Sequence, residues 1–187
     1  DNNDIININN KKSFNKHIAI CGGFNSSSKT LRTCEIFDIN KRKCINIDNL
    51  NEPRNNAGIC YIKQLHKLII GGGMNYGDGA QQIELYDFNK NQWILHSATT
   101  NYKHSYPTIW EDNCNPNIIY IAGDSIGIGG GGRNCSIGTF GYIEYLDIRD
   151  RNSKKFNILY PSTVDQLWSF KGMKRKLNWA SRALFSL

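Results

Sequence analysis

The chain of 187 residues carries a net charge of +7 and contains 40 % hydrophobic and 21 % charged residues, as expected of a globular protein. No stretch approaches the roughly 20 apolar residues of a membrane-spanning helix, so no membrane span is predicted. The charge allows an acidic partner, but the heavy use of Asn, Ile and Lys accounts for it more simply, and nucleic acid is disfavoured.

The first predicted element is a polar, Asn-rich segment, residues 1–16, which lacks the apolar region of a secretory signal. Alternating apolar residues and short Asn- and Lys-rich turns then predict three groups of β-strands between residues 17 and 160. In the first group only DIININ, near the start of the chain, is available as a first strand, and it matches poorly. The strands of the other two groups are expected at 57–62, 67–72, 82–88 and 92–97, and at 106–111, 118–123, 142–148 and 155–159.

A basic tail, residues 161–187, follows the strands and differs from them in pattern. It carries +4 of the net charge, from five basic residues and one acidic residue. Its apolar residues fall at helical spacing, which predicts a short C-terminal helix. The tail either covers an exposed strand edge, binds a membrane surface or partner, or stays outside the domain; packing or disorder is favoured over lipid binding. The spaced apolar residues are Met173, Leu177, Ala180 and Leu184.

The strand groups are internal repeats. HIAICGGFN (17–25) aligns with KLIIGGGMN (67–75), and NIIYIAGDS (117–125) follows at nearly the same spacing. Downstream of each, CEIFD, IELYD and IEYLD share a Glu, two apolar or aromatic residues and an Asp. The period near 50 residues is that of a repeat architecture, in which each unit is one small sheet. The expected repeats are residues 17–52, 53–101 and 102–160.

This pattern resembles the kelch repeat, whose signature is a glycine doublet after an apolar strand, followed by Tyr and Trp with six residues between them. The second repeat carries every element, with Tyr86 and Trp93. The first has Phe37 and Cys44 at those places, and the third departs most, with Phe156 as the aromatic substitute three residues late. The structural repeat positions expected from the resemblance are Gly22, Gly23, Gly72, Gly73, Gly123, Tyr86 and Trp93.

The resemblance implies an all-β fold: a partial kelch-type β-propeller of about three four-stranded antiparallel blades. Closed propellers have about four to eight blades. Three explanations therefore stay open. The chain is a piece of a longer propeller, which we favour, or another chain completes the ring, or the blades form an open arc.

The glycine-rich stretches are interpreted as architecture. GDSIGIGGGGRNC contains the dinucleotide-binding spacing of glycines, but the strand-like TFGYIEYLD follows it where that motif needs a helix. No cofactor is predicted. The Pro53-Arg54 pair belongs to the repeat in the kelch pattern, so a structural role is favoured for Arg54, and Lys103 is expected at the corresponding place in the third repeat.

No residue pattern points to catalysis or metal binding. Glu35, Glu84 and Glu144 recur one repeat apart, too far from one another to act as a pair on one bond. No two of the six cysteines have the spacing of zinc ligands. Four of them, Cys21, Cys34, Cys44 and Cys60, fall in apolar positions, as buried free thiols do. This favours a reducing compartment, and we expect the cytoplasm.

The resemblance implies protein–protein recognition through loops, with no enzymatic activity. Because strand directions alternate, the loops between second and third strands share one face with the links between blades. An acidic or extended peptide would suit this polar, mildly basic face. The alternatives are a piece of a kelch-like propeller enzyme and a structural or actin-associated kelch protein. The expected partner-binding residues are Arg32, Tyr76, Asp78, Tyr102, His104, Arg133 and Asn134.

Overall fold

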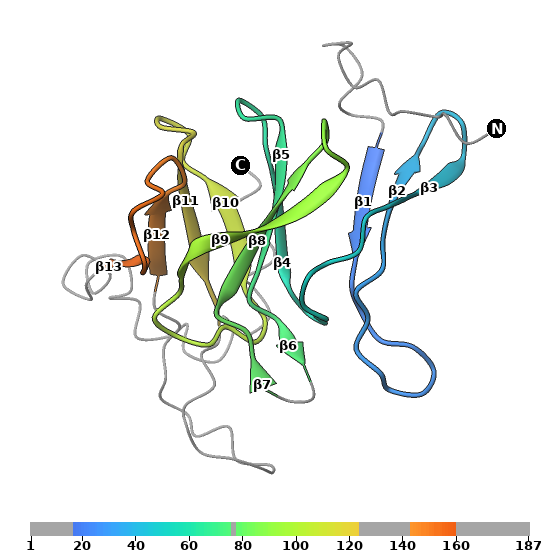
Figure 1. Cartoon of the computed structure of the whole chain (residues 1–187), viewed down its shortest axis with the longest axis horizontal. Helices are drawn as coiled ribbons and strands as arrows, with labels where there is room; N and C mark the ends of the chain where they lie inside the picture. Colours follow the sequence, from blue (N-terminus) through green and yellow to red (C-terminus); the bar gives the residue numbers. More distant parts are fainter. Residues whose placement is uncertain (1–16, 76–77, 124–142, 160–187) are drawn as a thin grey trace, which may run out of the picture.

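Three antiparallel β-sheets follow one another along the chain, and we call them blades one to three (Figure 1). The structure is a computed structural model that describes residues 17–75, 78–123 and 143–159, and the regular elements of these ranges are all strands. Blade one contains β1 (His17–Cys21), β2 (Cys34–Asp38) and β3 (Lys43–Ile47), in that order.

Blades two and three have four strands each. Blade two has the order β4 (Gly58–Ile62), β5 (Lys67–Gly71), β8 (Gln82–Asp87) and β9 (Gln92–Thr99). Blade three has the order β10 (Thr108–Glu111), β11 (Ile118–Ala122), β12 (Ile143–Asp147) and β13 (Asn157–Leu159). A small hairpin of β6 (Met74–Asn75) and β7 (Asp78–Gly79) interrupts the connection between β5 and β8.

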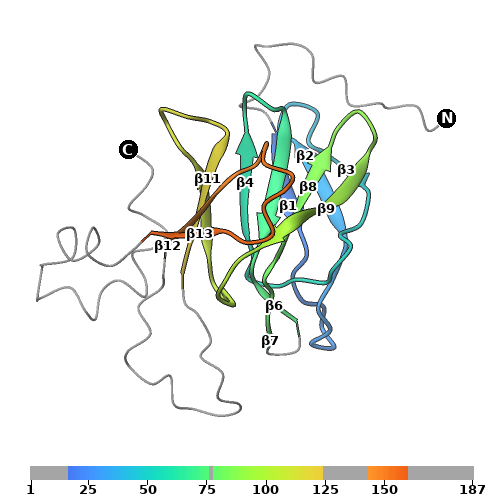
Figure 2. The ribbon, with the colours of Figure 1, turned by 60° about the vertical axis from the view of Figure 1, so that its left-hand side comes forward.

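Blade two lies between the other two blades, as the turned view of Figure 2 also shows. Two hydrophobic cores fill the two junctions, because alternate side chains of blade two point to opposite faces. The core toward blade one contains Cys34, Ile36, Ile47, Leu50, Leu68, Ile70, Tyr86 and Trp93. The core toward blade three contains Ile62, Ile69, Ile83, Ala98, Ile109, Ile119, Ile121, Leu146, Ile148 and Phe156.

The position of blade two between its two neighbours explains why the residues before Gly72 are continuously apolar. Residues 68–71 of β5 are all buried, since one blade covers each of their faces. The outer face of blade one shows the contrast. Ile18 and Ile20 of β1 are 50 % and 47 % exposed, although their equivalents Leu68 and Ile70 lie in a core.

The predicted strands of the second and third repeats agree with the observed strands to within two residues at every end. The fourth strand of blade two is longer than predicted, because β9 continues to Thr99 through a register shift opposite Gln82 and Glu84. The β6–β7 hairpin was not predicted. DIININ and the tail helix lie outside the described residues.

Aspartates close the turn that follows the third strand of each blade. In blade one, the Asp38 Oδ1 atom accepts hydrogen bonds from the backbone N–H groups of Asn40 (2.9 Å) and Lys41 (3.0 Å). Asp87 and Asp147 accept equivalent bonds from the backbone N–H groups of Asn89 and Arg149. These Asx turns fix the hairpins between the third and fourth strands.

Candidate functional site

A buried glutamate anchors the link from blade one to blade two. The Asn51 backbone N–H and side-chain Nδ2 donate to the Glu84 Oε2 atom at 2.7 and 2.8 Å. Arg54 donates to Glu84 Oε1 from Nε at 3.2 Å and from Nη2 at 3.1 Å, and its Nη1 donates to the Gly72 carbonyl at 3.0 Å. Arg54 and Glu84 are both fully buried. The link is therefore tied to both β8 and the glycine doublet of blade two.

The same arrangement recurs in blade three. The Asn101 backbone N–H and Nδ2 donate to Glu144 Oε2 at 2.7 and 2.8 Å, and the Tyr102 N–H reaches Oε1 at 3.0 Å. His104 Nε2 lies 3.0 Å from the Glu144 Oε1 atom. His104 and Glu144 are also fully buried. The segments NEPR (51–54) and NYKH (101–104) are thus equivalent in space.

This equivalence corrects two sequence interpretations. His104, and not Lys103, occupies the place of Arg54, because it is His104 that lies on the equivalent oxygen of the buried glutamate. His104 is also not available to a partner, since its side chain is 0 % exposed. Phe156 does replace Trp93: the carbonyls of both accept a bond from the link asparagine, at 2.7 Å from Asn101 and 3.0 Å from Asn51.

The charges of these anchors are compensated inside the protein. Burial raises the pKa of Glu144, but the hydrogen bonds from His104, Asn101 and Tyr102 together outweigh it and bring the pKa below its ordinary value. Burial lowers the pKa of Arg54, and the Glu84 carboxylate opposes that effect. Every oxygen of these carboxylates has a donor, so the anchors are satisfied structural networks and offer no open site for chemistry.

The glycine doublets clamp each blade to the link that follows it. The Gly23 N–H donates to the Arg54 carbonyl at 2.7 Å, and the Gly73 N–H donates to the His104 carbonyl at the same distance. A Cβ atom on Gly22 would lie 2.2 Å from the Arg54 oxygen. All four doublet residues, Gly22, Gly23, Gly72 and Gly73, also have positive φ angles, which glycine adopts most readily.

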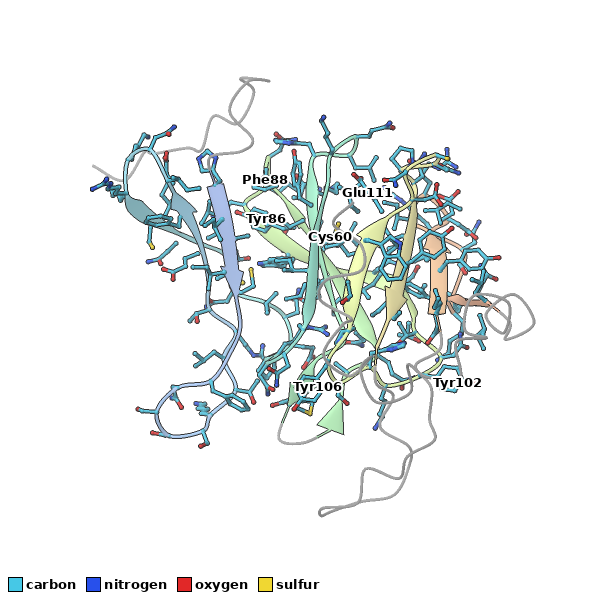
Figure 3. All side chains as sticks on the ribbon, turned by 180° about the vertical axis from the view of Figure 1, so that it is seen from behind. Cys60, Tyr86, Phe88, Tyr102, Tyr106 and Glu111 are labelled. Carbon is cyan, nitrogen blue, oxygen red and sulfur yellow. The ribbon has the colours of Figure 1, made fainter. Side chains whose placement is uncertain are left out.

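The loops that carry most of the predicted partner-binding residues gather at one end of the blades, the lower end in Figure 1. We call this the loop end; it comprises residues 22–33, 48–57, 72–75, 78–81 and 100–107. Arg32 is exposed there, Asp78 lies in β7 at the tip of the small hairpin, and Tyr102 is half-buried (Figure 3). Tyr76, Arg133 and Asn134 lie outside the described residues.

The structure adds two aromatic side chains that the sequence reasoning missed. Phe24 is 57 % exposed and Tyr106 is 51 % exposed, and Figure 3 shows Tyr106 at the loop end. Both belong to loops, and binding residues are often found on loops that a rigid scaffold positions. A sequence signal existed for Phe24, since it stands between a glycine doublet and the polar run Asn25-Ser26-Ser27.

Hydrogen bonds between loops hold the loop end in one shape. Asn55 and Met74 exchange backbone bonds of 3.0 and 2.8 Å, and the Asn55 Nδ2 atom donates to the Met74 carbonyl at 2.7 Å. On the other side, the Thr100 N–H donates to the Gln81 carbonyl at 2.9 Å. Asn55 is therefore buried between the loops.

An apolar cavity of about 250 Å³ lies between blades one and two, away from the anchors. It holds few polar groups and no metal-binding arrangement. Within the described part of the chain, no three His, Cys, Asp or Glu side chains are grouped so that they could hold a metal ion. The described residues also contain no helix long and apolar enough to cross a membrane. The cavity is lined by His17, Ala19, Ile36, Ile59, Cys60, Tyr61, Leu68 and Phe88.

Comparison with known proteins agrees with the blade architecture over part of the chain. A stretch of 73 residues, 39 % of the chain, is 33 % identical to Kelch-like protein 7 of Rattus norvegicus and, to the same extent, to Kelch-like protein 7 of Mus musculus. The match covers 12 % of the length of each relative, and no family model matches the chain. The described residues fold into three blade-like antiparallel sheets, and this partial similarity agrees with them. The fold is all-β and blade-like, as in a partial kelch-type β-propeller.

Proposed function

We propose that this chain is a kelch-repeat interaction scaffold that binds a partner protein through its loop end. The observation that carries the proposal is the pair of exposed aromatic residues, Phe24 and Tyr106, on loops that a hydrogen-bonded framework holds in place. Rigid strands that present loops are a common basis of protein recognition. The partial similarity to Kelch-like protein 7 supports a scaffold in place of an enzyme.

The chemistry of the loop end favours a partner with both apolar and acidic groups. Phe24 and Tyr106 supply aromatic surface, and tyrosine and arginine are enriched among residues that dominate binding energy. Lys29 and Arg32 are exposed on the loop of Phe24 and would pair with carboxylates. An acidic, extended peptide satisfies both requirements. Tyr76, Asp78, Tyr102, Arg133 and Asn134 remain in the proposed surface as expectations from the sequence.

Three organisational expectations belong to the same proposal. The repeats span residues 17–52, 53–101 and 102–160, and further blades, from the same protein or another chain, complete the ring. The scaffold works in the cytoplasm, which the free thiols of the five described cysteines support.

Capture of partners from a cell lysate, followed by mass spectrometry, tests the proposal. A Phe24→Ala, Arg32→Ala, Tyr106→Ala variant should melt within a few degrees of the wild type, since exposed positions change stability by about 0.5 kcal/mol or less. It should lose its specific partners, because truncating a hot-spot residue costs roughly 2 kcal/mol or more.

The matched control replaces three exposed lysines at the opposite end of the blades, Lys41, Lys63 and Lys90, with alanine. This control removes positive charge without touching the loop end, and it should retain the partners. Equal loss of partners in both variants would assign binding to general charge. Retention by both, with loss on deletion of residues 165–187, would place the binding site in the tail and overturn the proposal.

A further inference from the structure

Two cysteines lie directly opposite each other on neighbouring strands of blade one. Cys21 of β1 and Cys34 of β2 are Cα partners in the antiparallel register. The next backbone bond, from the Gly22 N–H to the Thr33 carbonyl at 2.9 Å, shows that Cys21 and Cys34 form a non-hydrogen-bonded pair. Such pairs have Cα atoms about 4.5 Å apart and side chains on the same face. A disulfide needs about 4.4–6.8 Å between Cα atoms.

The two thiols already interact. The hydrogen bond with Cys34 raises the pKa of the Cys21 thiol, and burial adds to the effect. The same hydrogen bond lowers the pKa of Cys34, against the opposing effect of burial. Cys34 is only 4 % exposed, while Cys21 is half-buried at the edge of the core between blades one and two. A small reagent reaches this pair more easily than a bulky one.

The arrangement is particular to this pair among the described cysteines. Cys44 lies opposite Phe37, and Cys60 lies opposite Ile69. Cys114 is exposed in the turn between β10 and β11. Exposure alone would favour oxidation of Cys44 and Cys114, whereas geometry favours a bond between Cys21 and Cys34. The two expectations can be separated by experiment.

We propose that Cys21 and Cys34 are a redox pair that hydrogen peroxide converts to a reversible disulfide. The Cys34 thiolate attacks one peroxide oxygen, the O–O bond breaks, and a sulfenic acid and one water form after protonation. The Cys21 sulfur then attacks the Cys34 sulfur, the S–O bond breaks, and a second water leaves with the Cys21 proton. Two thiols are oxidised by two electrons and one peroxide is reduced to two waters. A dithiol reductant reverses the reaction by exchange.

The disulfide would close a covalent ring at the base of the loop of residues 22–33. That loop carries Phe24 and Arg32, and it also holds the first glycine doublet against Arg54. Cross-linking residues that lie close in sequence removes conformations from the unfolded chain and stabilises the folded one. The expected effect is a rise in Tm of roughly 5–10 °C, reversed by reduction. This inference does not depend on the proposed binding function.

Peptide mapping of the purified chain tests the proposal. The chain is treated with hydrogen peroxide, free thiols are blocked with N-ethylmaleimide, and tryptic peptides are analysed by mass spectrometry. The expected product is a linked pair of peptides containing Cys21 and Cys34, two hydrogen atoms lighter than their sum, which dithiothreitol separates. The wild-type protein suffices for this step, so a variant that fails to fold does not affect it.

Melting curves of two variants complete the test. Cys34→Ser should abolish the peroxide-dependent rise in Tm, and Cys44→Ser, which leaves the pair intact, should retain it. If Cys34→Ser does not fold, Cys21→Ser replaces it. Blocking of both Cys21 and Cys34 by maleimide after peroxide treatment, or linkage of either to Cys44 or Cys114, would overturn the proposal.

Discussion

Arg54 and His104 occupy equivalent positions 50 residues apart, and each lies within 3.2 Å of the same oxygen of an equivalent buried glutamate. Their carbonyls also accept identical 2.7 Å bonds from Gly23 and Gly73. One backbone design thus accepts an arginine in one repeat and a histidine in the next. The link between blades, more than the blades themselves, carries the polar core of this protein.

The first prediction concerns removal of one partner from a buried anchor. His104→Ala should destabilise the protein by roughly 3–5 kcal/mol, because it leaves the Glu144 carboxylate buried with one donor fewer. His104→Arg, which copies the second repeat, should recover a large part of that loss. Urea denaturation followed by tryptophan fluorescence measures both. If the alanine and arginine variants were equally unstable, the equivalence of the two anchors would be contradicted.

The second prediction concerns pH. The pKa of Glu144 lies below its ordinary value of 4.5 in the folded protein, so its ionised form contributes stability that is complete above pH 4.5 and is lost as the pH falls through the lowered value. Glu144→Gln should therefore be less stable than the wild type at pH 7, and the difference should shrink below pH 4.5.

Denaturation curves at several pH values between 7 and about 3 check this expectation. Other carboxylates, such as Asp87 with its lowered pKa, titrate in both proteins and cancel in the difference. A difference that stayed constant throughout this range would rule out a stabilising charge on Glu144.

The third prediction separates backbone conformation from close approach in a glycine doublet. Gly22 and Gly23 both have positive φ, which costs an alanine about 1–2 kcal/mol. A Cβ atom on Gly22 would also collide with the Arg54 carbonyl, whereas a Cβ on Gly23 meets no atom within 4 Å. Gly22→Ala should cost about 1–3 kcal/mol more than Gly23→Ala, by thermal or chemical denaturation. Equal destabilisation by the two substitutions would mean that the Arg54 carbonyl does not lie in close contact with Gly22.

The fourth prediction concerns the aromatic residue of the second repeat. Trp93 is 2 % exposed, and its indole Nε1 donates to the Asp48 carbonyl at 3.0 Å across the junction of blades one and two. Trp93→Ala should cost roughly 3–5 kcal/mol. Its neighbour Ile94 points to the other face and is 40 % exposed, so Ile94→Ala is the control and should cost about 1 kcal/mol or less. Similar losses in both variants would argue against the core assigned to Trp93.

Local sequence patterns determined the strands and their turns. The alternation in QIELYDF predicted β8, and the short Asn- and Lys-rich segment after it predicted the turn, because both depend on residues close in sequence. The kelch-like spacing of Gly72, Tyr86 and Trp93 similarly indicated a blade, since the same contacts recur whenever this unit packs on another.

Only the tertiary structure decided which residues meet across the links. Lys103 and His104 are neighbours in the chain, and spacing alone favoured Lys103; burial and the position of Glu144 selected His104. Cys44 shows the same limit, because it lies at the place of Trp93 yet is exposed, since no described blade covers that face of blade one. Strand pattern is a local property of the chain, whereas burial depends on the neighbouring blade, and a single repeat does not encode its neighbour.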